Sequence, residues 1–194
     1  MHLTEAKIVN DTVNPNSGQA DWSQAPLRDL IEHLLERDHV WLRFQLPEIE
    51  AMLTAVISAD GGRHSAVLTP LRRVFQHFKQ DAESHMRKEE TVLFPAILKL
   101  ETTRQAGLTP PRWPFGSLSN PVRMMCQDHE KCTWSLEEMR QITGNYTPPD
   151  DATDTLRNVY RRLAGLETDI REHVRLEHNV LFPRAVQLEK ASKG

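Results

Sequence analysis

The feature that most constrains the fold is a short sequence motif that occurs twice in the chain. Residues 85–95 read HMRKEETVLFP, and residues 173–183 read HVRLEHNVLFP. The shared positions are His85/His173, Glu89/Glu177, Val92/Val180, Leu93/Leu181, Phe94/Phe182 and Pro95/Pro183. A histidine and a glutamate four residues apart leave an α-helix on one face, about 40 degrees apart around its axis. The repeat therefore predicts two equivalent helices that present the same two polar side chains.

Residues that break helices divide the chain into four long helical segments. We expect these helices at about residues 27–57, 70–100, 121–144 and 155–188. Gly61-Gly62 is typical of a helix end, while Thr69-Pro70 and Asn120-Pro121 are typical of an N-cap followed by a first helical residue. No segment has a convincing strand pattern. The sequence therefore predicts an all-α fold, an up-down-up-down four-helix bundle.

The predicted bundle is flanked by a tail and interrupted by one long link. Residues 1–25 are rich in Asn, Asp, Ser, Thr and Gln without periodicity, so we expect a flexible N-terminal tail and a single domain at residues 26–190. The link at residues 102–119 is too long for a simple bundle turn. We expect its Trp113 and Phe115 to pack as a lid over one end of the bundle, with an ordinary helix-crossing connection as the alternative.

Charge and composition exclude several classes of partner. The net charge of -3 includes no long basic or acidic block, which argues against nucleic acid. No apolar run approaches the ~18 residues of a membrane span, and the N-terminus lacks the basic and apolar segments of a signal peptide. Cys126 and Cys132 are the only cysteines and form no disulfide framework. We therefore expect a cytoplasmic protein with neither nucleic acid nor membrane as partner.

Each predicted helix has an apolar stripe at three- and four-residue spacing, and polar residues interrupt every stripe. The stripe of the second helix includes Ala82, His85, Glu89, Val92, Ala96 and Leu100, and that of the fourth includes Ile170, His173, Glu177 and Val180. Taken singly, such a histidine is more often a hydrogen-bonded core residue, and such a glutamate more often reaches solvent. Six of them at one level of a bundle would cost several kcal/mol for each buried ion unless they were paired or bound to metal. The sequence thus predicts a metal site formed by His39, His85, Glu89, His129, His173 and Glu177.

The spacing indicates how many ions this site would hold. Each His-x-x-x-Glu projects an imidazole and a carboxylate about one turn apart, so one helix can serve two metals. Four imidazoles, two bridging carboxylates and a bridging oxide or hydroxide would give each of two ions five ligands. Such a mixed nitrogen and oxygen set favours iron, then manganese, over zinc. No His-Glu-x-x-His motif is present, and the Glu-x-x-His motif of other di-metal bundles occurs once only, at Glu36–His39, rather than on two helices.

These residues also carry a resemblance to a known family. Arg37-Asp38-His39, SHMRKEETVLFP, CQDHEKC and EHVRLEHNVLFP resemble the hemerythrin-like (HHE cation-binding) family, and within it the Repair of Iron Centres di-iron proteins, over residues from about 27 to 188. The resemblance implies a non-haem di-iron centre. In that centre the four histidines would be terminal ligands and the two glutamates bridging ligands.

The same resemblance implies a role in repairing iron–sulfur clusters under nitric-oxide or oxidative stress by supplying labile iron. Iron–sulfur proteins would then be the clients, and nitric oxide or oxygen the small molecules bound. The alternatives are a nitric-oxide or oxygen sensor or carrier, and a nitric-oxide reductase or peroxidase enzyme. Many members carry an N-terminal Cys-Cys pair, but the first 25 residues here contain no cysteine. Oxygen-carrying hemerythrins use five histidines, whereas four occupy core positions here.

The other histidines are expected to lie outside the site. His33 and His77 fall off the stripes that carry the proposed ligands, and His64 follows the Gly-Gly pair, so we interpret all three as surface residues. His178 is next to Glu177, but it lies about 140 degrees around the helix from His173. We therefore exclude His178 from the residues that would touch metal.

Five further residues near the site each have two interpretations. Cys132 is either a small core residue or a redox group beside His129. Asp81 and Asp169 precede the repeated histidines by four residues and either accept the outer imidazole proton or lie in solvent. Pro95 and Pro183 interrupt helical patterns, so we expect each to kink or stop its helix.

Overall fold

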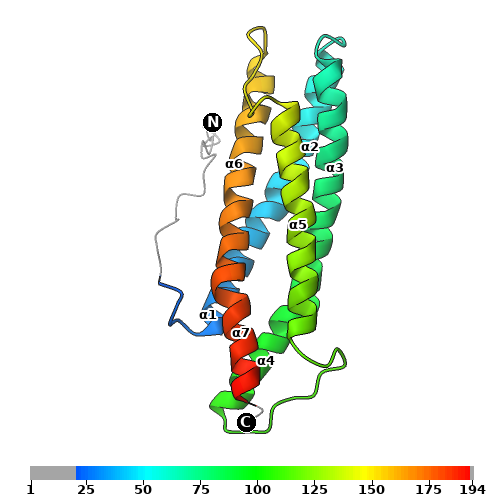
Figure 1. Cartoon of the computed structure of the whole chain (residues 1–194). Coiled ribbons are helices and arrows are strands. Elements are labelled where there is room, and N and C mark those ends of the chain that lie inside the picture. The colour runs from blue at the N-terminus through cyan, green and yellow to red at the C-terminus, as the bar shows by residue number, and fades with distance from the viewer. Residues whose placement is uncertain (1–20, 193–194) are drawn as a thin grey trace, which may run out of the picture.

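The structure, a computed structural model, describes residues 21–192, which are helical throughout apart from the connections, with no strand in that range. Four rods of helix run side by side, and the chain passes up, down, up and down through them (Figure 1). The rods comprise α1 Leu27–His33, η1 Leu34–His39 and α2 Val40–Ala59; α3 Ser65–Lys88, η2 Glu89–Leu93 and α4 Phe94–Gln105; α5 Ser119–Ile142; and α6 Asp154–Leu176, η3 Glu177–Leu181 and α7 Phe182–Ala191. The predicted all-α four-helix bundle is confirmed.

Two predicted helix starts are wrong. The helix α5 begins at Ser119 with Leu118 as its N-cap, so Asn120 and Pro121 lie inside it. The second rod begins at Ser65, so Pro70 lies inside α3 and Thr69 is not its N-cap. The Asp60 carboxylate accepts a hydrogen bond from the His64 backbone N–H at 2.6 Å, which fixes the helix start five residues earlier than predicted. Pro70 then removes only the bond to the Ala66 carbonyl, and Ala66 is exposed, so water can replace that bond.

Three of the rods contain a π-helical turn, which is wider by one residue than an α-turn. In η1, η2 and η3 the closing N–H groups of Val40, Phe94 and Phe182 bond carbonyls five residues back. Pro95 and Pro183 directly follow two of these turns, at the start of α4 and α7. The prolines therefore do not stop the helices, because the wide turn accommodates the missing N–H. α4 leaves the direction of α3 at this point (Figure 1).

The extra residue of each π-turn changes which residues face the core within that turn. Val92 was predicted to lie on the apolar stripe, but it is 42% exposed, whereas the next residue, Leu93, is fully buried. Val180, the equivalent of Val92 in the second copy, is only half-buried, and Leu181 is fully buried. The predicted stripes therefore fail at Val92 and Val180, within the π-turns, whereas Ala96 and Leu100 beyond η2 are buried as predicted.

The apolar core consists of two clusters. An upper cluster is built from α2, α3, α5 and α6, and includes Leu46, Phe78 and Leu163. A lower cluster is built mainly from α1, α4 and α7, with Leu30 and Phe94 among its buried residues. In Figure 1 the elements of the lower cluster lie at the bottom of the bundle. The buried polar residues of the candidate site come from the level between the two clusters.

The link between α4 and α5, residues 106–118, closes the lower end. Trp113 and Phe115 stack with ring centroids 5.5 Å apart and pack against the lower cluster, as predicted for a lid. Glu189 accepts a hydrogen bond from the Ser117 hydroxyl at 2.6 Å and fixes the end of the link.

The N-terminal segment is described only in part. Residues 1–20 of the predicted tail lie outside the described residues. Arg184 donates hydrogen bonds to the carbonyls of Trp22 and Ala25, so the chain just before α1 lies against α7. Among the described residues, no helix combines the length and apolarity needed to cross a membrane.

Candidate metal centre

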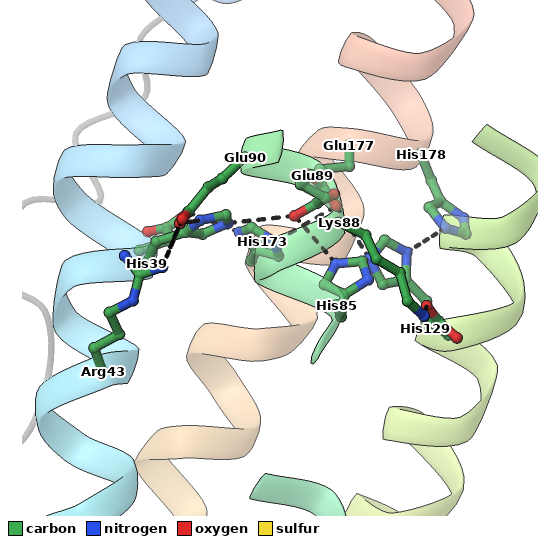
Figure 2. Close-up of polar contacts among 12 residues, drawn as sticks. His39, Arg43, His85, Lys88, Glu89, Glu90, His129, His173, Glu177 and His178 are labelled. Carbon is green, nitrogen blue, oxygen red and sulfur yellow. Dashed lines mark hydrogen bonds and ion pairs between the residues drawn. The ribbon is translucent and has the colours of Figure 1, made fainter. Parts of the chain in front are cut away.

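All six residues predicted to form the metal site are buried, and the fold brings them together. His39 ends η1, Glu89 and Glu177 begin η2 and η3, and the remaining histidines come from α3, α5 and α6. Figure 2 shows the two carboxylates lying among the imidazoles in the middle of the bundle. No side chain of the set is more than 5% exposed: His39, His85, Glu89, His129, His173 and Glu177.

The four imidazoles form two pairs. The ring centroids of His39 and His173 lie 5.5 Å apart, and we call these residues the first pair. The centroids of His85 and His129 lie 4.5 Å apart, and these residues form the second pair. Distances between the pairs are longer, 6.5 Å from His85 to His173 and 6.4 Å from His129 to His173. The cluster therefore has two places where two imidazoles converge.

Each glutamate lies between the two pairs. Glu89 Oε2 is 3.3 Å from Nε2 of His39 and 3.2 Å from Nε2 of His85. Glu177 Oε2 is 3.1 Å from Nε2 of His129 and 3.4 Å from Nε2 of His173. Each carboxylate thus contacts one imidazole of the first pair and one of the second, which is the arrangement needed to join two cations.

Five of the donor atoms at the centre lack hydrogen-bond partners among the described residues, whereas Nε2 of His85 and Nε2 of His129 lie 3.0 Å apart. Both oxygens of Glu89, both oxygens of Glu177 and Nε2 of His39 are buried without a hydrogen bond. An unsatisfied buried polar atom costs about 1–3 kcal/mol, so a protein that retains five of them at one point has a reason to do so. Two groups of these side chains have donor atoms close enough to hold an ion: His85, His129, His173 and Glu177, and His39, Glu89 and His173. The residues present therefore fit a cluster of cations.

The protonation of the site agrees with this interpretation. Burial, and then the charge on Glu89, raise the pKa of Glu177 well above its usual value. Burial opposes the charge on Glu89 too, but the neighbouring His85 and His39 hold the pKa of Glu89 below its usual value. Burial, with the charge on His85 next in size, lowers the pKa of His129 to about 2, so that imidazole is neutral and can bind metal. The two carboxylates therefore have pKa values shifted in opposite directions.

The outer nitrogens of the proposed histidine ligands have hydrogen-bond partners that the sequence analysis largely missed. His39 Nδ1 is 2.8 Å from Glu90 Oε1, and His173 Nδ1 is 3.1 Å from Asp38 Oδ2. His129 Nδ1 is 2.8 Å from Nε2 of His178. His85 Nδ1 is buried and has no hydrogen-bond partner.

The predicted exclusion of His178 from the innermost residues agrees with this geometry, because His178 reaches only the outer nitrogen of His129. Its role as a partner could have been found in the repeat, where His178 follows Glu177 as Glu90 follows Glu89. Burial lowers the pKa of His178. The carboxylate behind His173 comes from Asp38 on another rod, whereas Asp169 keeps a buried oxygen without a partner.

The remaining candidates lie away from the cluster. His77 is exposed, and His33 lies against the ring of Trp22 at 4.8 Å. His64 is not a free surface residue, because its two nitrogens contact Asp60 at 2.5 Å and Asp151 at 3.1 Å. Cys132 is 5% exposed in the upper cluster, and burial raises its pKa to about 12. The thiol of Cys132 therefore stays protonated, which favours the core interpretation.

Comparison with known proteins places this geometry in a family context. Residues 30–185 match the family model described as the hemerythrin HHE cation-binding domain. Similar proteins include two named "Iron-sulfur cluster repair protein YtfE", from Musicola paradisiaca (34% identity, covering 96% of this chain and 78% of the relative) and Cronobacter sakazakii (36%, covering 89% and 72%). A protein of the same name from Escherichia coli is 33% identical, with 96% of this chain and 77% of the relative covered.

Proposed function

The chain belongs to the hemerythrin HHE cation-binding domain family, and on that premise we propose that it is a non-haem di-iron protein that acts in iron–sulfur cluster repair. The observation that carries the proposal is the placement of Glu89 and Glu177. Each lies between the two histidine pairs with its oxygens free of hydrogen bonds. In this proposal the metal ligands are His39, His85, Glu89, His129, His173 and Glu177.

Iron is the metal that suits this donor set. Two neutral imidazoles and two shared carboxylate oxygens at each position, with a bridging oxide or hydroxide, form the mixed nitrogen and oxygen environment of non-haem iron. When bound, a pair of iron ions supplies one-electron redox chemistry and a position for a small ligand such as nitric oxide or oxygen. The protein's own residues supply the rest: the six proposed ligands exclude water, since all are buried, and hydrogen bonds from behind fix the imidazoles of His39, His129 and His173.

The repair role rests on the relatives. Proteins that this chain matches over most of both lengths are named for iron–sulfur cluster repair. We propose that this chain supplies labile iron to damaged iron–sulfur proteins under nitric-oxide or oxidative stress. Cys126 and Cys132 are both free thiols, which fits a reducing compartment, so we propose the cytoplasm as its location.

The metal assignment is tested by loading. Protein loaded with ferrous iron under nitrogen should hold two irons per chain, and exposure to air should produce near-ultraviolet bands of an oxo-bridged pair. Glu89→Ala and Glu177→Ala should each lose most of the paired iron, because each residue joins both positions. His33→Ala and His77→Ala are the controls and should keep it. One iron per chain, or selective retention of zinc, would exclude the di-iron centre.

The repair role is tested by transfer. We expect the reduced, iron-loaded protein to restore activity to an iron-depleted cluster enzyme when sulfide and thiol are supplied, and the Glu89→Ala variant to fail. If the reduced protein instead keeps both irons against a ferrous chelator and binds nitric oxide or oxygen reversibly, the donor role is wrong. A sensor or carrier role would then replace it.

A further inference from the structure

The two copies of the repeated motif differ at the residue that follows each proposed bridging glutamate. Glu90 follows Glu89 in the first copy, and His178 follows Glu177 in the second. Both side chains do the same structural job, since each bonds the outer nitrogen of a proposed ligand on a neighbouring rod. Figure 2 shows Glu90 and His178 at opposite ends of the cluster, behind His39 and His129 respectively.

The first pair of histidines is backed by negative charge. Glu90 accepts from His39 at 2.8 Å and is itself held by Arg43 at 2.6 Å. The other member of this pair, His173, has the Asp38 carboxylate 3.1 Å behind it. A carboxylate behind an imidazole raises the basicity of the nitrogen that faces the metal and fixes the ring.

The second pair has no carboxylate behind it. When His129 turns Nε2 toward the metal position, its proton lies on Nδ1 and is donated to Nε2 of His178, another imidazole. His85 Nδ1 has no hydrogen-bond partner at all. Asp128, which precedes His129 in the chain, does not supply the missing charge, because its two oxygens accept from Lys88 and Lys131.

The second pair is also the more accessible of the two. His178 is exposed and lines a mostly apolar groove of about 490 Å³ between α5 and α7, which also includes Phe182 and Val122. Two of the lining side chains, His178 and Phe182, lie against the His129 ring, with ring centroids 4.9 and 6.0 Å from it. The equivalent groove beside the first pair, about 420 Å³, contains the Arg43–Glu90 ion pair, which lies in front of His39.

From these contacts we propose that the two metal positions are unequal, and that the position held by His85 and His129 is the one that releases and exchanges its ion, with His178 as the positioning residue that keeps it labile. The position held by His39 and His173 keeps its ion. This proposal presupposes the paired iron centre proposed above, and it specifies which half of the centre acts as the donor.

The two copies of the motif suggest the test, because the residue found in one copy can be substituted into the other. Wild-type protein loaded with two ferrous ions under nitrogen should give them to a colorimetric ferrous chelator in two phases of one iron each. Partners behind a metal-bound histidine change metal affinity by about 10–100-fold. We therefore expect His178→Glu to slow the fast phase by about that factor and leave the slow phase unchanged. Glu90→His should accelerate the slow phase.

His178→Gln provides the matched variant, since it keeps a hydrogen-bond acceptor behind His129 without adding charge. Its fast phase should stay within a few-fold of the wild-type rate, and its metal-free melting temperature should match that of His178→Glu. A purely structural role for His178 predicts instead that Gln and Glu have the same effect on release. Release of both irons in one phase that neither Glu90→His nor His178→Glu alters would overturn the proposal while leaving the di-iron centre intact. Failure to load two irons at all would overturn both.

Discussion

Replacing Glu177 by methionine should make the metal-free protein more stable. Glu177 is fully buried, both its oxygens lack hydrogen bonds among the described residues, and burial together with the Glu89 charge raises its pKa. Methionine has a similar volume and no oxygen to leave unsatisfied. The substitution removes a desolvation cost that only a bound cation offsets.

The size of the effect follows from the unsatisfied group. An unpaired buried polar group costs about 1–3 kcal/mol, so we expect a gain of about 2 kcal/mol. In a chain of this length, 1 kcal/mol shifts the melting temperature by about 2–4 °C. The metal-free Glu177→Met protein should therefore melt about 4–8 °C above the metal-free wild type. Ferrous iron should reverse the order, because a ligand present at 100 times its dissociation constant adds about 2.7 kcal/mol to the wild type only.

Glu167 is the matched control, a second buried glutamate on the same rod. It is 3% exposed, but its oxygens accept hydrogen bonds from Arg140, Arg171 and the Tyr146 hydroxyl. Glu167→Met removes these bonds and should destabilise the protein by about 2–3 kcal/mol, with or without metal.

The assay is thermal unfolding followed by circular dichroism, with chelator or with ferrous iron under nitrogen, on the wild type and the two variants. In chelator, we expect Glu177→Met to raise the melting temperature and Glu167→Met to lower it. If Glu177→Met loses as much stability as Glu167→Met in the metal-free state, then Glu177 is a paired structural residue. The reasoning that assigns it to a metal site would be refuted.

Three further predictions concern packing, helix phase and pH. Leu166→Ala, at a fully buried position of the upper cluster, should cost about 2–5 kcal/mol in a chemical denaturation, and a loss below 1 kcal/mol would contradict the packing described. Val92→Asp should change stability by less than about 0.5 kcal/mol while Leu93→Asp unfolds the domain, an order that an uninterrupted α-helix would reverse. Hydrogen bonds and charges from Asp60 and Asp151 raise the pKa of His64. The contribution of His64 to stability is therefore fully present below its ordinary pKa of 6.5 and is lost as pH rises through the raised value. In His64→Gln that part of the pH dependence of the unfolding free energy should vanish.

The sequence was sufficient to predict the bundle and the inner residues of the site because both depend on helical periodicity. Helix faces repeat every 3.6 residues, so a histidine in an apolar stripe had to lie inside, and His39 and His129 are indeed buried. The π-turns could not be predicted in the same way. They leave the local composition unchanged and shift the phase locally, which is why Val92 was wrongly placed in the core.

The outer partners were missed for a different reason. Asp38 and Glu90 each bond a histidine on another rod, so their role depends on distances between helices. Asp169 was considered because it lies four residues before His173 on the same helix, yet the Asp38 carboxylate is the one that reaches that ring. Periodicity tells which face a residue occupies, but not which neighbour meets it there. A comparison of the two copies of the motif would have indicated Glu90 and His178 as equivalent hydrogen-bond partners.

The division of the apolar core into two clusters has a consequence for motion. The upper and lower clusters meet at a layer of histidines and glutamates, so in the metal-free protein little apolar contact ties one to the other across that layer. The lower part, with α1, α4, α7 and the link, can then open as a unit while the upper part stays folded. Amide hydrogens of the two parts should exchange at separate rates without metal. In the proposed di-iron state the two ions would join all four rods at that layer, and the two parts should then exchange as one.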